Sequence, residues 1–208
     1  MKYFILFASC FILNHVFSQQ YTPLSGTFTY SISLQQHPDS SFIPVSSMVM
    51  YTNDTMVRVD SESFQMGKQV LINHLLLHKS YLLISYNDKQ YAIQTHEKQD
   101  TIPSKYQFRY KNKSKKIKGL KAKQVIVSSE YFRKPLTMWY FPQYSPKYLS
   151  VLKGIKGLPA EYYITTQEGV LRYTLENIDF TPPGKDLFGV PSNYKKTSFD
   201  DFFNEINP

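Results

Sequence analysis

The chain has 208 residues and a formal net charge of +8, and 16% of its residues are aromatic. This length suits one domain with a substantial core. Cys10 is the only cysteine and lies in the N-terminal segment. Removal of that segment would exclude disulfides, cysteine-ligated zinc and thiolate nucleophiles.

Residues 1–18 have the pattern of a secretory signal peptide. A single Lys2 precedes an apolar stretch, and Ser18 is a small residue at the predicted cleavage site. The stretch ends before it reaches the roughly 20 apolar residues of a transmembrane helix. Lipidation of Cys10 is the alternative to ordinary cleavage. We therefore expect an exported protein that is periplasmic, associated with the outer membrane or secreted, with one β-rich domain over 19–208.

The first half of the chain predicts consecutive strands. Every second residue of 27–34 is apolar, which is the period of a strand with one wet face. Asn53-Asp54 and Asn87-Asp88 suit tight hairpin turns, since both residue types tolerate positive φ. The nearly continuous apolar segment 70–77 has the length of a strand rather than a helix. The other predicted strands in this half are 48–51, 55–60, 81–86 and 90–93.

The second half continues the pattern up to a turn-rich segment that begins the C-terminal tail, 181–208. A polar turn is expected at 112–115, and helices are expected only at 143–153 and 198–206. The predicted strands are 106–111, 123–127, 136–141, 162–165 and 170–175. Successive hairpins predict an antiparallel meander, and we expect an all-β protein.

The strongest charge feature is a basic segment, 105–123, without an acidic residue. Its cations are Lys105, Arg109, Lys111, Lys113, Lys115, Lys116, Lys118, Lys121 and Lys123. Most of them would lie on the wet side of an edge strand, which explains them without a ligand. An anionic envelope surface or a protein partner is an alternative. Nucleic acid is disfavoured because an exported protein rarely meets it.

No catalytic signature stands out. His74 and His78 share one side of a strand or a helix, but no carboxylate completes a metal-binding motif nearby. Serine-nucleophile motifs are missing, and the sequence nominates no carboxylate pair for glycoside hydrolysis. We expect a protein that is not an enzyme and that needs no metal or cofactor, with an uncharacterised hydrolase as the third reading.

Short motifs in the second half resemble the GLPGLI family of exported proteins of Gram-negative bacteria. They are Lys-Ile-Lys-Gly-Leu-Lys at 116–121, the strand with Trp139, and Lys-Gly-Ile-Lys-Gly-Leu-Pro-Ala-Glu-Tyr at 153–162. The likeness extends over roughly 26–195. Ala160 replaces the second glycine of the family motif, and Ala122 stands where relatives often have a cysteine. We interpret Gly157, Leu158 and Pro159 as a structural turn that sets the entry of a strand.

The resemblance implies a fold and a function. The fold would be a strongly curved antiparallel sheet, an incomplete β-barrel of the periplasmic lipoprotein-carrier type with one or two short helices. Its concave side would bind a lipid, a lipoprotein or another apolar ligand, with Trp139, Tyr140, Tyr162 and Tyr163 as candidate lining residues. The alternative function is a structural or interaction subunit of an envelope complex.

Overall fold

The computed structural model describes residues 20–63, 67–96, 106–130 and 132–206. The predicted signal peptide, Lys105 and the cysteine lie outside these residues. The described residues form twelve strands, two short 3-10 helices and one α-helix. The protein is therefore mostly β, as the sequence predicted.

Most strands follow one another along the chain through short turns, but long connections precede β10 and β12. The strands are β1 Ser25–Gln35, β2 Ile43–Asn53, β3 Met56–Ser63, β4 Gly67–His74, β5 Lys79–Tyr86, β6 Lys89–His96, β7 Gln107–Ile117, β8 Leu120–Ser128, β9 Leu136–Phe141, β10 Leu158–Thr166, β11 Gly169–Asp179 and β12 Lys195–Ser198. The helices are η1 Pro146–Tyr148, η2 Lys185–Phe188 and α1 Phe199–Ile206.

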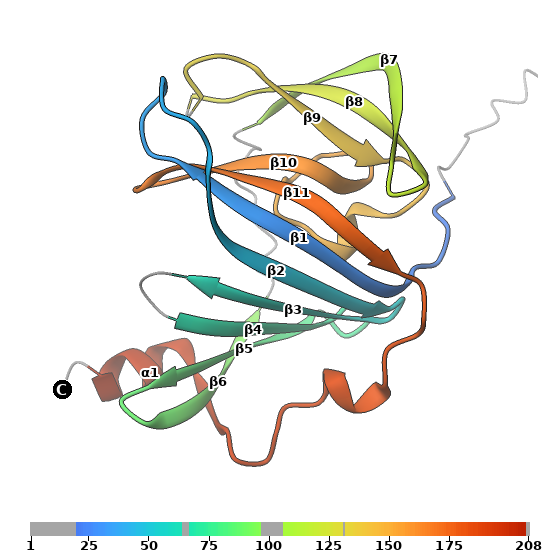
Figure 1. Ribbon diagram of the computed structural model, residues 1–208. Coiled ribbons are helices and arrows are strands. Elements are labelled where there is room, and N and C mark those ends of the chain that lie inside the picture. Colours follow the sequence, from blue (N-terminus) through green and yellow to red (C-terminus); the bar gives the residue numbers. More distant parts are fainter. Residues whose placement is uncertain (1–19, 64–66, 97–105, 131, 207–208) are drawn as a thin grey trace, which may run out of the picture.

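All twelve strands belong to one sheet in the order β12-β6-β5-β4-β3-β2-β1-β11-β10-β9-β8-β7. Consecutive strands pair antiparallel from β1 to β6 and again from β7 to β11, which confirms the meander. Two pairings are not between consecutive strands: β11 pairs antiparallel with β1, and β12 pairs parallel with β6. The sheet curves but does not close, so β7 and β12 form its edges (Figure 1). The predicted curved sheet, or incomplete barrel, is confirmed.

The larger half of the sheet consists of β1, β2 and β7–β11, and it surrounds one apolar cluster. Phe28, Met50 and Tyr162 are fully buried there, and they define what we call the inner face of the sheet. The connection between β9 and β10, residues 142–157, covers this face with Tyr148, Leu152 and other apolar side chains. The inner face of the larger half is therefore filled by the protein's own chain.

The smaller half consists of β3–β6 and β12, and the C-terminal tail lies against both of its faces. On the outer face, Val190 and Tyr194 pack against Ile72 and Leu83. The chain then adds β12 to the edge, and α1 places Phe202 on the inner face in a second small cluster. Figure 1 shows this path of the tail around the edge of the sheet. The tail is thus part of the folded domain.

Four details differ from the sequence predictions. The helix expected at 143–153 reduces to η1, because Pro146 and the following irregular backbone allow only one 3-10 turn. The turn expected at 112–115 lies inside β7, where a bulge absorbs the irregularity. The strand expected at 70–77 begins and ends three residues earlier. The parallel strand β12 was not predicted, because four polar-flanked residues carry no strand period.

Candidate ligand-binding face

One row of apolar side chains crosses the inner face from the larger half to the smaller half. Each member pairs with the next across neighbouring strands, so all of them point to the same side. The row consists of Phe28, Met50, Val59, Leu71, Leu82 and Ile93. Its two ends are buried, but Leu71 in its middle is 39% exposed.

Leu71 is exposed because two parts of the chain cover the two ends of the row and neither of them extends to its middle. Residues 142–157 bury the row at Phe28 and Met50, and α1 buries it at Ile93 through Phe202. Val59 and Leu82, on either side of Leu71, are only partly buried. An apolar strip at the centre of a sheet thus faces solvent between two covered ends. We call Val59, Leu71 and Leu82 the open strip.

Helix α1 also has exposed apolar side chains on one of its sides. Phe199 and Phe203 are 51% and 45% exposed, and their ring centroids lie 4.7 Å apart. Glu205 of the same helix forms an ion pair with Lys195 on β12 at 2.8 Å. Phe203 is about 200° from Glu205 around a helix of 3.6 residues per turn. The two phenyl rings therefore lie on the flank of α1 that faces away from the β12 edge.

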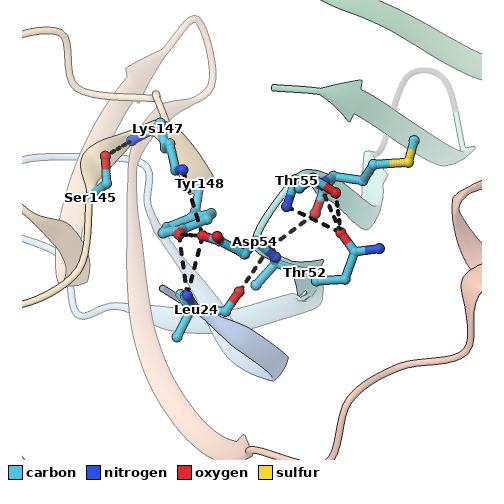
Figure 2. A network of polar contacts seen from close by, with 9 residues as sticks. Leu24, Thr52, Asp54, Thr55, Ser145, Lys147 and Tyr148 are labelled. Atoms are coloured by element: carbon cyan, nitrogen blue, oxygen red, sulfur yellow. Dashed lines mark hydrogen bonds and ion pairs between the residues drawn. The ribbon is translucent and has the colours of Figure 1, made fainter. Parts of the chain in front are cut away.

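A polar network links residues 142–157 to the turn between β2 and β3 (Figure 2). The hydroxyl of Tyr148 donates a hydrogen bond to the carboxylate of Asp54, in the turn between β2 and β3. The N–H of Leu24 donates to the same carboxylate at 3.4 Å and to the Tyr148 oxygen at 3.2 Å. Lys147 approaches Asp54 at 3.6 Å. The network thus links Leu24, which precedes β1, to the β2–β3 turn and to residues 142–157.

The local sequence explains why Asp54 can reach this network. Asp54 has a φ of 73°, a left-handed conformation that aspartate tolerates better than most residues. The side chain of Asn53 accepts hydrogen bonds from the N–H groups of Thr55 and Met56, which closes the turn. The side chain of Asp54 is thereby free to point at Tyr148.

The electrostatics of the network favour a charged Asp54 and a neutral Tyr148. Burial acts to raise the pKa of Asp54, but the hydrogen bond from Tyr148, the charge of Lys147 and the Leu24 N–H lower it below its ordinary value. Burial and the bond to Asp54 raise the pKa of Tyr148. The contact is a charge-assisted hydrogen bond across the pH range in which most proteins are stable.

The four predicted lining residues lie on opposite faces of the sheet. Tyr140 and Tyr162 are buried on the inner face, whereas Trp139 and Tyr163 follow or precede them in their strands and point outward. Tyr162 stacks on Tyr173 at 4.6 Å, and its hydroxyl has no hydrogen-bond partner within the described residues. Burial raises its pKa. None of the four contributes to the open strip.

The Gly157-Leu158-Pro159 segment lies at the beginning of β10. Leu158 is fully buried in the main cluster. Gly157 has no positive φ; a side chain there would collide with the Phe141 carbonyl oxygen and lie 2.6 Å from the Tyr140 ring. Glycine is therefore needed here for the close approach to β9 rather than for a positive φ.

The basic segment forms the edge strand β7 and the turn into β8. Lys115 contacts Glu161 at 2.7 Å and lies 4.5 Å from the centroid of Trp139. Lys118 pairs with Glu176 at 3.5 Å. Within the described residues the other cations of the segment have no ion pair; they are Arg109, Lys111, Lys113, Lys116, Lys121 and Lys123. Lys116 and Lys121 lie directly opposite each other.

Within the described residues, no cluster of three or more His, Asp, Glu or Cys side chains is arranged to hold a metal. None of the helices described has the length and apolarity required to cross a membrane. The absence of a metal and of a cofactor stays a prediction from the sequence.

The fold and the open strip define a class: an open, curved antiparallel sheet whose inner face is covered at both ends. No family model matches the chain, and no curated protein matches it in sequence. Two solved structures of PNGF-II, in the C2 and P21 space groups, have TM-scores of 0.53 and 0.54 at 14% and 13% identity. Each alignment covers 88% of this chain and 33% of that chain, so this chain spans a third of the PNGF-II length. The likeness shows a shared fold.

A LolA superfamily protein, NE2245 from Nitrosomonas europaea, is a more distant neighbour. It has a TM-score of 0.38 and 10% identity, and the alignment covers 83% of this chain and 93% of that chain. This score is too low to carry an argument about the fold or the ligand.

Proposed function

We propose that this is an exported, non-enzymatic envelope protein that binds a lipid, a lipoprotein or another apolar ligand on its inner face. The observation that carries the proposal is the exposure of Leu71 in a row whose two ends are buried. We further propose that the chain belongs to the GLPGLI family, on the motifs at 116–121 and 153–162. No catalytic role is assigned to any residue.

Physical reasoning supports a ligand at the open strip. Val59, Leu71 and Leu82 are cross-strand neighbours, and contiguous apolar surface that reaches solvent often marks a binding site. The strip lies between the end of the row that residues 142–157 bury and the end that Phe202 of α1 buries. An acyl chain would place its CH2 groups against such a surface at about 0.8 kcal/mol per buried group.

A fluorescent apolar probe tests the proposal. N-phenyl-1-naphthylamine should gain fluorescence on the native protein and lose affinity by about tenfold with Leu71→Glu, because the carboxylate would be buried with the probe. Leu76→Glu is the matched control, since Leu76 is 66% exposed in the β4–β5 turn and outside the row. Equal effects of both variants, or no binding at all, would contradict the proposal. Native mass spectrometry of protein from its own envelope would identify the ligand.

The export component has a separate test. Expression of the full chain in a Gram-negative host should give a protein that begins after Ser18, measured by intact mass. A mass that retains residues 1–18, or a lipid mass on Cys10, would contradict ordinary cleavage.

The free edge of the sheet favours a second candidate, an interaction subunit. β7 is the last strand of the sheet and carries unpaired lysines, which suits an added strand from an acidic partner. A stoichiometric partner copurifying with the tagged protein should be lost with Lys113→Glu/Lys116→Glu and kept with Lys68→Glu on β4. Retention in the first variant would rule out docking at this edge.

A further inference from the structure

The outer face of the smaller half contains a cavity of about 220 Å³ that the open strip does not share. It lies where the C-terminal tail crosses β3, β4 and β5. Its apolar wall includes Ile72, Tyr81, Phe188 and Val190. Leu71 and Ile72 are neighbours in β4 and point to opposite faces, so the two surfaces are separated by the sheet.

The tail is held firmly enough to keep the cavity in shape. Arg58 on β3 donates a hydrogen bond to the carbonyl oxygen of Leu187 at 3.0 Å, and Phe188 next to it is buried. Val190 and Tyr194 pack on the outer-face cluster of Ile72 and its neighbours. One wall is thus a 3-10 helix anchored by a guanidinium, and the floor is the sheet itself.

The rim of the cavity is basic. His74 and Lys79 are directly paired residues of β4 and β5, and Lys196 comes from β12. Both lysines are exposed, and within the described residues neither forms an ion pair. Nδ1 of His74 accepts the N–H of Leu77 at 3.3 Å, which leaves Nε2 as its other polar atom. No carboxylate belongs to the described lining residues.

We infer that this cavity is a second binding site, for a small amphiphilic carboxylate whose head group meets Lys79 and Lys196. The apolar wall requires a hydrocarbon tail, and the unpaired lysines require a negative head. At about 30 Å³ for each water-sized group in a liquid, the cavity holds roughly seven such groups. A straight-chain acid of about eight carbons fits this size, and a membrane phospholipid does not.

Octanoate is the probe, and methyl NMR of the intact chain is the measurement. Addition of octanoate should shift the methyl signals of Ile72 and Val190 in a saturable way and leave the methyl signals of Leu71 unchanged. Octylamine has the same tail with the opposite charge and should not bind. Lys79→Gln/Lys196→Gln should weaken octanoate binding by about tenfold or more, as expected when charge-assisted bonds are lost.

Two further variants keep the test specific. Lys116→Gln/Lys121→Gln removes the same charge from the distant β7–β8 hairpin, so unchanged affinity separates a local site from general attraction to a basic protein. Val190→Phe should fill the cavity and abolish the shifts while the thermal unfolding of the protein stays cooperative. If the Lys79→Gln/Lys196→Gln and Lys116→Gln/Lys121→Gln variants bind octanoate with equal affinity, the inference is overturned. It is also overturned if no methyl signal shifts up to the solubility limit of octanoate. Leu71→Glu should leave octanoate binding intact, which separates this site from the inner face.

Discussion

The two halves of the sheet are stabilised in different ways. The larger half surrounds a single cluster of fully buried aromatic and aliphatic side chains, and its cover is tied down by Asp54 and Tyr148. The smaller half has a thin cluster on each face. Its helix is held by Phe202 and by exposed ion pairs of Glu205 with Lys89 and Lys195. One half has a thick core with a fixed cover, and the other has two thin layers with a lightly held cover.

This difference indicates which part of the inner face can bind a ligand. The inner face of the larger half is already occupied by the chain's own residues, whereas the open strip begins where that cover ends. A ligand there would contact the half with the thinner clusters, where we expect local opening to require less free energy than global unfolding. The larger half thus supports the fold, and the smaller half offers the surface.

The largest expected effect separates the cores of the two halves. Phe28→Ala should lower the free energy of unfolding by about 3–5 kcal/mol, because Phe28 is fully buried in the main cluster. Phe202→Ala should release α1 while the amides of β1 and β11 remain protected from hydrogen exchange. Denaturant unfolding and hydrogen exchange measure both. If Phe202→Ala exposes β1 and β11 as well, the two halves form one cooperative unit and the comparison fails.

The next largest effect on stability concerns Gly157, the last of the residues 142–157 that cover the larger half. Gly157→Ala should cost about 1–3 kcal/mol, since its side chain would meet the backbone of Phe141, which cannot move without disturbing β9. Gly184→Ala in the tail is the matched control, because nothing lies within 4 Å of the added carbon. Urea unfolding of both variants provides the comparison. An equal loss of stability in the two variants would mean that the close approach at Gly157 does not contribute to the cost of the substitution.

Local patterns allowed the hairpins to be predicted from the sequence. Asn87 and Asp88 both have positive φ and form the turn between β5 and β6, as their residue types indicated. The alternation of 27–34 lies inside β1. The helix predicted at 198–206 is α1, and the hydroxyl of Ser198 before it accepts the N–H of Asp201 at 3.0 Å, as a capping side chain does.

Features that depend on distant residues could not be predicted in this way. Leu71 lies in a segment that reads as a continuously buried strand, and only the register of six strands reveals that nothing covers it. Tyr162 and Tyr163 look equivalent in the sequence, but neighbouring residues of a strand face opposite sides. The conformation of 142–157 is set by its packing and by the bond of Tyr148 to Asp54, which are 94 residues apart. Local propensity contains no information on such pairs.

A smaller effect tests how the cover is tied down. Tyr148→Phe should cost about 0.5–1.5 kcal/mol, because the lost hydrogen bond to Asp54 is part-buried and water partly screens its charge. The folded protein lowers the pKa of Asp54, so its contribution is complete above the ordinary carboxyl pKa and is lost as the pH falls through the lower folded value. The stability difference between the native protein and Asp54→Asn should therefore shrink in acid, measured by urea unfolding between pH 3 and pH 7. A difference that is constant with pH would contradict this role.

The smallest expected effect concerns the exposed ion pairs that attach helix α1 to the sheet. Hydrogen bonds from Lys195, Lys89 and Tyr91 lower the pKa of Glu205 to about 2, and because the folded value is depressed, the contribution of Glu205 is present at neutral pH and is lost as the pH falls toward about 2. Glu205→Gln should lower the helix content of α1 slightly at pH 7, measured by backbone NMR shifts of residues 199–206. About 1 M salt should have the same effect on the native protein, since it screens exposed charges strongly. Asp200→Asn on the same helix is the control, because it removes one negative charge for which no ion pair is described, and an equal response there would contradict the role of the ion pairs of Glu205. A response confined to Glu205 would mean that exposed charges decide how firmly α1 covers the inner face, whereas the cover of the larger half depends on buried side chains.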